Sequence, residues 1–166
     1  MYKTVVVTAS DRCFTGQMQD SSGPLVEESL PPKDFTILER KIVPDDIEVI
    51  KGALMHFVNR GDVDLILTTG GTGFGPRDVT PEATSMVIQR RTPGIEFAIY
   101  SRGVQSTPYA VLSRGVSGIR HKTLIINLPG NPDSIEESID ALVPVLPHAL
   151  NLIKSDSAED EHKFIK

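Results

Sequence analysis

The sequence has no tryptophan, a single cysteine and no long apolar run. One cysteine, Cys13, excludes an internal disulfide and a metal site made of several thiolates. No apolar stretch approaches the roughly 20 residues needed to cross a bilayer. The first residues lead almost directly into a predicted strand, where a secretion signal would need a charged and then an apolar segment. We therefore expect a cytoplasmic protein that makes no membrane contact.

Basic residues are outnumbered among the charged side chains. The chain carries 17 Lys and Arg against 22 Asp and Glu, a net charge of −5. This balance argues against a nucleic-acid partner, which would favour a basic face. An anionic small ligand would have to be held by local features of the chain.

The length of 166 residues and the hydrophobic content of 39% fit one domain with a substantial core. We assign residues 1–153 to this domain and residues 154–166 to a polar, charged C-terminal tail that we expect to be disordered.

Short β-branched runs alternate with amphipathic segments along the domain. Predicted strands cover residues 3–9, 35–43, 65–67, 115–119 and 122–128, and predicted helices cover residues 24–30, 47–60, 81–90, 93–100, 108–112, 133–142 and 145–153. Alternating strands and helices are typical of an α/β fold with a mostly parallel sheet and helices on both faces.

The most informative stretch follows the third predicted strand. Gly70, Gly71 and Gly73 alternate with threonines, and glycine lets the backbone approach a phosphate and direct N–H groups at it. Thr80 and Pro81 then open a helix, with Thr80 predicted as the N-cap, and a helix N-terminus favours an anion. If only the glycines are considered, the alternative interpretation is a tight turn that binds no ligand. The loop is neither a Walker A loop nor a dinucleotide-binding fingerprint.

Polar side chains also follow the other predicted strands. Ser10 and Asp11 follow the first strand, Asp45 follows the second, and Asn131 follows the last. The carboxyl ends of parallel strands meet at one edge of a sheet, where ligands gather. The alternatives are turn capping for Ser10 and Asp11, and helix N-capping for Asp45 and for Asn131.

Residues 68–73 (TTGGTG) and 76–84 (PRDVTPEAT) resemble the signature of the molybdopterin adenylyltransferase family. This family includes the bacterial MogA and MoaB proteins and the G domain of gephyrin. The similarity extends from the first strand to about residue 153. It implies a single three-layer α/β/α domain and a homotrimer.

The resemblance also implies an activity, the transfer of AMP from Mg-ATP to molybdopterin with release of pyrophosphate. The essential aspartates of the family match Asp45 and Asp78, which we predict to be catalytic and to bind Mg²⁺, and a family serine at the pterin/nucleotide site matches Ser113. The predicted substrate-binding residues are Thr69, Gly70, Gly71, Thr72, Gly73, Ser10, Asp11, Arg77, Ser113 and Asn131. Arg114 and Lys122 are further candidates for anion contacts.

We expect this chain to act without the domain that inserts the metal in fused relatives, so the resemblance also implies a separate molybdenum-insertion protein as a partner. The alternative function is a trimeric scaffold that binds molybdopterin or a nucleotide without transferring AMP.

Overall fold

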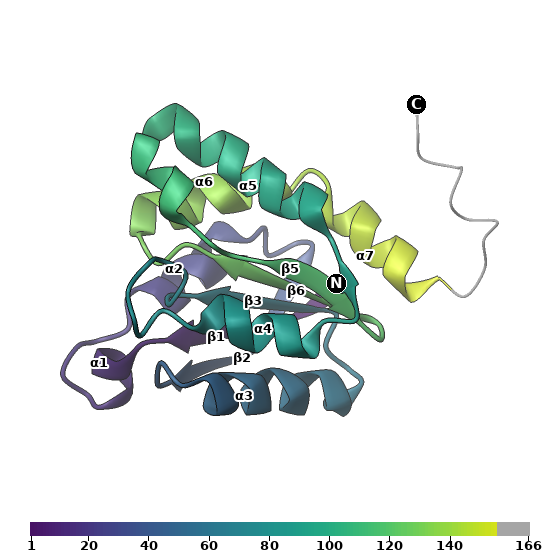
Figure 1. Ribbon diagram of the computed structural model, residues 1–166. Helices are drawn as coiled ribbons and strands as arrows, with labels where there is room; N and C mark the ends of the chain where they lie inside the picture. Colours follow the sequence, from purple (N-terminus) through teal and green to yellow (C-terminus); the bar gives the residue numbers. More distant parts are fainter. Residues whose placement is uncertain (156–166) are drawn as a thin grey trace.

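The computed structural model describes residues 1–155, and these form a six-stranded sheet between two layers of helices (Figure 1). The strand order is β2-β1-β3-β6-β5-β4. Strands β2, β1, β3 and β6 run parallel, whereas β5 and β4 are antiparallel to their neighbours. The strands are β1 (Tyr2–Ala9), β2 (Phe35–Val43), β3 (Leu65–Thr69), β4 (Arg90–Arg91), β5 (Ser117–Arg120) and β6 (Thr123–Leu128). The predicted α/β fold with a mostly parallel sheet is confirmed.

Helices cover both faces of the sheet. They are α1 (Asp11–Phe14), α2 (Ser22–Ser29), α3 (Ile47–Arg60), α4 (Thr80–Val87), α5 (Pro93–Ser106), the 3-10 helix η1 (Pro108–Leu112), α6 (Pro132–Leu142) and α7 (Leu146–Lys154). Helices α3 and α4 pack on one face, and α2, α5, α6 and α7 pack on the other (Figure 1).

The core lies on both sides of the central strands. In β1, Val5 and Val7 face the α3–α4 layer, while Val6 faces the α2–α6–α7 layer, because successive side chains of a strand point to opposite faces. All three valines are fully buried. A strand covered on both faces has no solvent side, which explains its nearly continuous apolar sequence.

The predicted end of α4 and the predicted start of α2 are wrong. Helix α4 ends at Val87, because Ile88 has an extended backbone, and Arg90–Arg91 form the edge strand β4 that pairs with β5. Helix α2 begins at Ser22, before Pro24, because the Asp20 carboxylate accepts hydrogen bonds from the Ser22 and Gly23 amides.

The C-terminal boundary differs slightly from the prediction. Lys154, predicted to begin the tail, is the last residue of α7. The remainder of the predicted tail, residues 156–166, lies outside the described residues. Over residues 1–155, no helix combines the length and apolar character that a membrane span requires.

Candidate functional site

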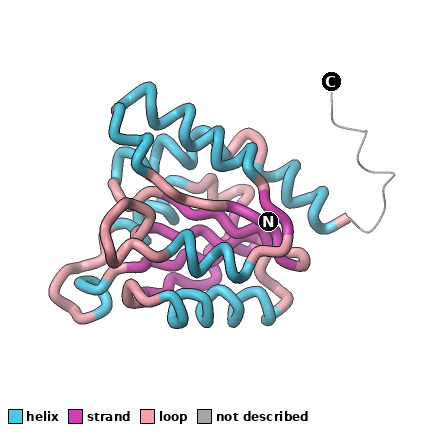
Figure 2. Tube along the Cα trace, in the orientation of Figure 1, coloured by secondary structure: helices cyan, strands magenta, loops and turns pink. Residues whose placement is uncertain are grey.

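The site lies at the edge of the sheet where the four parallel strands end. The loops after β1, β2, β3 and β6 gather at this edge (Figure 2). They carry residues 10–11, 45, 70–78 and 129–131, respectively. The predicted convergence of these segments is therefore confirmed, and it follows from the strand order, since β1 and β3 are neighbours and β3 and β6 are neighbours.

The glycine loop after β3 requires glycine at two successive positions. Gly70 and Gly71 have φ angles of +88° and +67°, in the left-handed region that favours glycine. A Cβ on Gly70 would collide with the Ala9 carbonyl oxygen, and one on Gly71 would collide with Thr80 Oγ1 and lie 3.2 Å from Asp45 Oδ1. The loop therefore lies directly against β1, α4 and Asp45.

Thr80 has a different role from the predicted one. It is the first residue of α4, and Val79 occupies the N-cap position. The Thr80 hydroxyl donates to the Gly70 carbonyl oxygen at 3.0 Å, and its amide donates to the Gly71 carbonyl oxygen at 3.1 Å. Thr80 thus anchors the glycine loop to the start of α4.

Asp78 is enclosed by the second half of the same loop. Its Oδ2 accepts a hydrogen bond from the Gly75 amide at 2.8 Å. A Cβ on Gly73 or on Gly75 would lie 2.8 Å from this oxygen, so both glycines leave room for the carboxylate. Asp78 also lines the largest pocket described below.

Asp45 is not the N-cap of α3, because Asp46 has that role and its Oδ1 accepts from the Val49 amide at 3.0 Å. Asp45 Oδ2 accepts from the Asp11 amide at 2.9 Å. Asp45 Oδ1 is buried and has no hydrogen-bond partner among residues 1–155. Burial raises the pKa of Asp45, and the nearby carboxylates of Asp11 and Asp78 add to this effect.

Asp11 and Arg77 form an ion pair beside Asp45. The Asp11 carboxylate accepts from Arg77 Nε at 2.9 Å and from Nη2 at 3.0 Å, and Oδ1 also accepts from the Asp45 amide at 3.0 Å. The hydrogen bond from Arg77 lowers the pKa of Asp11. Ser10 is the N-cap of α1 and accepts from the Cys13 amide. The carboxylate of Asp11 thus accepts from the Asp45 amide, and the carboxylate of Asp45 accepts from the Asp11 amide.

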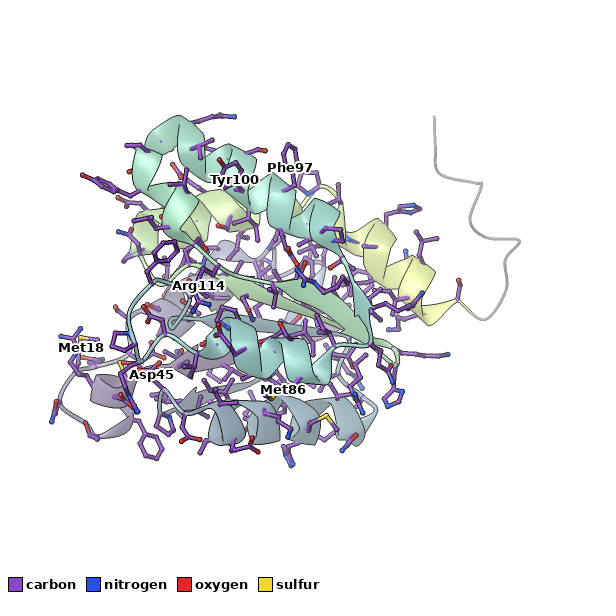
Figure 3. The ribbon with its side chains drawn as sticks, in the orientation of Figure 1. Met18, Asp45, Met86, Phe97, Tyr100 and Arg114 are labelled. Carbon is purple, nitrogen blue, oxygen red and sulfur yellow. The ribbon has the colours of Figure 1, made fainter. Side chains whose placement is uncertain are left out.

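A pocket of about 720 Å³ opens between the glycine loop and the segment formed by α5 and η1. Its polar end contains residues 71–73 and Asp78, and its wall contains Phe97, Tyr100 and Leu112. Ser113 and Asn131 also line it. Figure 3 shows Phe97 and Tyr100 on α5, on the opposite side of Arg114 from Asp45.

Several predicted site residues do not line this pocket. Thr69 is fully buried and donates from its hydroxyl to the Pro129 carbonyl oxygen at 2.9 Å. Asn131 is the N-cap of α6, as the capping alternative predicted, although it also lines the pocket. The predicted residues that lie behind or beside the glycine loop, outside the pocket lining, are Ser10, Asp11, Asp45, Thr69, Gly70 and Arg77.

Sequence reasoning missed the apolar wall of the pocket. Helix α5 was predicted to end near residue 100, but it continues to Ser106, and all of its residues are at least partly exposed. Exposed Phe97 and Tyr100, three positions apart on one helix face, are the signal that could have marked this wall.

The two basic candidates have other roles. Arg114 donates from Nε to the Gly73 carbonyl oxygen at 2.8 Å and from Nη2 to the Asp78 carbonyl oxygen at 2.6 Å, so it contacts the loop backbone. Lys122 lies just before β6, at the opposite edge of the sheet, where it lines a second cavity with Lys154. The expectation that Lys122 contacts an anion at this site is wrong.

The carboxylates at the loop suit a magnesium ion that brings most of its own ligands. Among residues 1–155 there is no cluster of three or more His, Cys, Asp or Glu side chains that could enclose a metal. Mg²⁺ usually takes one or two protein carboxylates and completes its shell with phosphate oxygens and water. Asp45 Oδ1 is a buried oxygen without a partner in this part of the chain, and Asp78 lies across the glycine loop, so these are the two residues that could hold such an ion.

Comparison with known proteins gives consistent matches over the described domain. Residues 5–148 match a family model described as a probable molybdopterin binding domain. The chain is 43% identical over 162 residues to gephyrin of Dictyostelium discoideum, covering 90% of this chain and 22% of gephyrin. It is 39% identical over 163 residues to the molybdopterin adenylyltransferase of Helicobacter pylori, covering 97% of this chain and 93% of that protein.

The fold also matches solved structures. The molybdopterin biosynthesis enzyme MoaB from Thermus thermophilus is 44% identical and superimposes with a TM-score of 0.87, covering 92% of this chain and 96% of that one. Sequence and structure therefore agree with the resemblance carried by the glycine loop, and the chain belongs to the molybdopterin-binding domain family of molybdenum cofactor biosynthesis.

Proposed function

We propose that this protein is a molybdopterin adenylyltransferase, which transfers AMP from Mg-ATP to the terminal phosphate of molybdopterin. The observation that carries the proposal is the placement of two carboxylates against the glycine loop: Asp78 lines the polar end of the 720 Å³ pocket, and Asp45 Oδ1 would lie 3.2 Å from a Cβ on Gly71. The similarity to an adenylyltransferase over nearly the full length of both chains supports it.

In the proposed reaction, a terminal phosphate oxygen of molybdopterin attacks the α-phosphorus of ATP. The new P–O bond joins AMP to molybdopterin, and the bond from the α-phosphorus to the bridging oxygen breaks, which releases pyrophosphate. In this transfer no covalent bond forms between the protein and a substrate. Positioning and electrostatic stabilisation account for most of its catalysis.

The chain supplies a phosphate site and two carboxylates. The backbone of residues 71–73 and the N-terminus of α4 hold the phosphates, and Arg77, at 65% exposure of its side chain, lies beside them. A Mg²⁺ ion bound by Asp45 and Asp78 would neutralise charge on the departing pyrophosphate. To bind the ion, Asp45 must be ionised and its Oδ1 must be free to contact Mg²⁺. The hydrogen bond that Oδ2 accepts from the Asp11 amide holds the carboxylate in place.

The rest of the pocket is the proposed place for the pterin. Phe97, Tyr100 and Leu112 offer an apolar wall to a flat ring, and Ser113 and Asn131 offer polar groups at its border. Ser10, Thr69 and Gly70 support the site from behind it: Ser10 caps α1, Thr69 holds the Pro129 carbonyl oxygen, and Gly70 lies against Ala9.

The test is to incubate the purified protein with molybdopterin, ATP and Mg²⁺ and to measure adenylylated molybdopterin and pyrophosphate. We expect equal amounts of both products from the wild type and a loss of both in Asp45→Asn and Asp78→Asn. Asp46→Asn is the matched control, because asparagine caps a helix as well as aspartate does and Asp46 caps α3.

A wild type that binds molybdopterin without forming product would refute the transferase and support the alternative function, a molybdopterin- or nucleotide-binding trimeric scaffold. Product that persists in both aspartate variants would refute the assignment of Asp45 and Asp78.

We also propose that the protein is a homotrimer in the cytoplasm, that its ligands are small molecules rather than a nucleic acid or a membrane, and that a separate molybdenum-insertion protein takes its product. Exposed apolar side chains on α5 and η1 support the assembly. They include Val104 (36% exposed) and Val111 (51%), which lie outside the pocket lining. Apolar side chains gathered on one surface are typical of a protein interface.

A further inference from the structure

One side chain, Arg114, joins two walls of the pocket. It follows Ser113, in the connection from η1 to β5, and its backbone amide donates to the Thr72 carbonyl oxygen at 2.8 Å. Its guanidinium donates from Nε to the Gly73 carbonyl oxygen at 2.8 Å and from Nη2 to the Asp78 carbonyl oxygen at 2.6 Å. Its Nη1 is hydrogen-bonded to the Glu82 carboxylate. Nη2 also donates to the second Glu82 carboxylate oxygen at 3.5 Å, so five hydrogen bonds connect Arg114 to the glycine loop and to α4.

The two carbonyl oxygens held by the guanidinium belong to the two ends of one loop segment, residues 73–78. Within that segment the Asp78 amide donates to the Gly75 carbonyl oxygen at 3.0 Å, and the Gly75 amide donates to Asp78 Oδ2 at 2.8 Å. Hydrogen bonds between Gly75 and Asp78 thus connect the segment within itself, and Arg114 holds the carbonyl oxygens at its two ends. The direction of the Asp78 carboxylate depends on this arrangement.

Glu82 fixes the guanidinium from the other side. It lies in the first turn of α4, and its carboxylate forms an ion pair with Arg114. The hydrogen bond from Arg114 lowers the pKa of Glu82, so this carboxyl remains ionised at neutral pH. Only arginine has a planar fork of donors that can reach two carbonyl oxygens and a carboxylate at once.

We propose that Arg114 is a positioning residue that sets the Asp78 carboxylate for catalysis by holding the Gly73 and Asp78 carbonyl oxygens, with Glu82 orienting its guanidinium. This inference rests on the proposed transferase function, because it assigns Arg114 an effect on the step that needs Asp78. It differs from a direct anion contact, since all three guanidinium nitrogens of Arg114 donate to groups of the protein.

The two roles predict different kinetics. A residue that contacts the substrate phosphate would mainly raise KM when removed. A residue that orients Asp78 lowers kcat with little change in KM, because ground-state binding survives while the reacting geometry is lost. A misplacement of roughly 1 Å at a reacting group can cost about 10²-fold in rate.

The experiment compares Arg114→Ala and Arg114→Lys with Arg60→Ala. Arg60 is the matched control, because it also pairs with carboxylates, those of Asp62 and Glu39, but lies at the C-terminal end of α3. We expect kcat to fall about 10²-fold in Arg114→Ala, with KM for molybdopterin nearly unchanged, and to fall less in Arg114→Lys. Added guanidinium should restore part of the rate of Arg114→Ala and none of that of Asp78→Asn. Unchanged kcat, or a rise in KM alone, would overturn the proposal.

A second measurement does not depend on the reaction. Amide hydrogen exchange at Gly75 and Asp78 should become faster in Arg114→Ala and Arg114→Lys, and should stay at the wild-type rate in Arg60→Ala. If the wild type makes no product, the proposed function fails, and the exchange rates then decide whether Arg114 holds the loop. Unchanged exchange in both Arg114 variants would overturn the positioning role even in an active enzyme.

Discussion

At Asp45, a single carboxylate has two oxygens in different situations. One accepts a hydrogen bond from the Asp11 amide, and the other is buried with no partner in the described chain. Burial disfavours the charged form and so raises the pKa of Asp45, while the positive charge of Arg77 opposes this shift. Because the charged form is the one that binds a cation, activity should fall as the pH decreases through this pKa.

The first prediction concerns this acid limb of the pH profile. In Arg77→Gln the cation that lowers the pKa of Asp45 is lost, so the pKa rises further and the acid limb of kcat/KM should move to higher pH. Arg77→Lys keeps the charge and should shift the limb less. The measurement is kcat/KM for molybdopterin against pH, which reports groups of the free enzyme. A limb that stays in place or moves to lower pH in Arg77→Gln would contradict this account.

The second prediction concerns backbone conformation in the glycine loop. Gly70→Ala should reduce the free energy of unfolding by about 1–3 kcal/mol, because alanine is strained at a φ of +88° and its Cβ would collide with the Ala9 carbonyl oxygen. Gly52→Ala, in the middle of α3, places its methyl group in open space and should stabilise the protein by about 0.5–1 kcal/mol. Urea denaturation of both variants tests the difference in sign. Equal effects would show that the loop tolerates a side chain.

At the scale of elements, the two adjacent aspartates that precede helix α3, Asp45 and Asp46, have different roles. Asp46 caps the helix through the Val49 amide, so Asp46→Ala should cost about 1 kcal/mol of unfolding free energy and leave the transferase rate unchanged. Asp45→Ala should abolish transfer although it removes no helix cap. Thermal denaturation and product formation, measured on both variants, provide the check. A loss of activity in Asp46→Ala with the fold intact would contradict the assignment.

Sequence reasoning left Asp45 open between these two roles for a physical reason. Both aspartates follow Pro44 and precede the apolar face of α3, so either satisfies the local capping pattern. Which of the two aspartates caps α3 depends on Asp11, which is 34 residues away in the sequence. Its carboxylate accepts a hydrogen bond from the Asp45 amide. A contact made through the fold leaves no local trace in the sequence.

Local signals predicted some elements well and others poorly. The second strand was predicted at its observed bounds, Phe35–Val43, because a β-branched and alternating run lies between clear turn residues. Strand β4 was missed, because Arg90 and Arg91 are both exposed and become a strand only by pairing with Gly118 and Ile119. The N-cap of α6 at Asn131 was found, since the Asn-Pro pair carries that signal within two residues.

Across the whole molecule, the candidate site combines a predictable half with an unpredictable half. The glycine loop and the strand-end aspartates lie at one edge of a parallel sheet, which the strand pattern and the resemblance anticipated. The apolar wall comes from α5 and η1, and it faces the loop because α5 packs against the core on the side of β5 and β6. Arg114 connects the segment after η1 to the glycine loop. Its contacts with the Gly73 and Asp78 carbonyl oxygens could not be predicted from its place next to Ser113 in the sequence.

The last prediction tests the proposed trimer through the surface of α5 and η1. Val104 and Val111 are 36% and 51% exposed and lie outside the pocket, so Val104→Glu and Val111→Glu add charge to this surface without changing the pocket lining. If copies of the chain associate here, burying an unpaired carboxylate would weaken the contact. Light scattering should then give about three times 18.1 kDa for the wild type and a lower mass for both variants. Met86→Glu, at a 57% exposed position on α4, is the control and should keep the wild-type mass. A monomeric wild type would refute the trimer, and a trimer that survives both substitutions would place its interface on another surface.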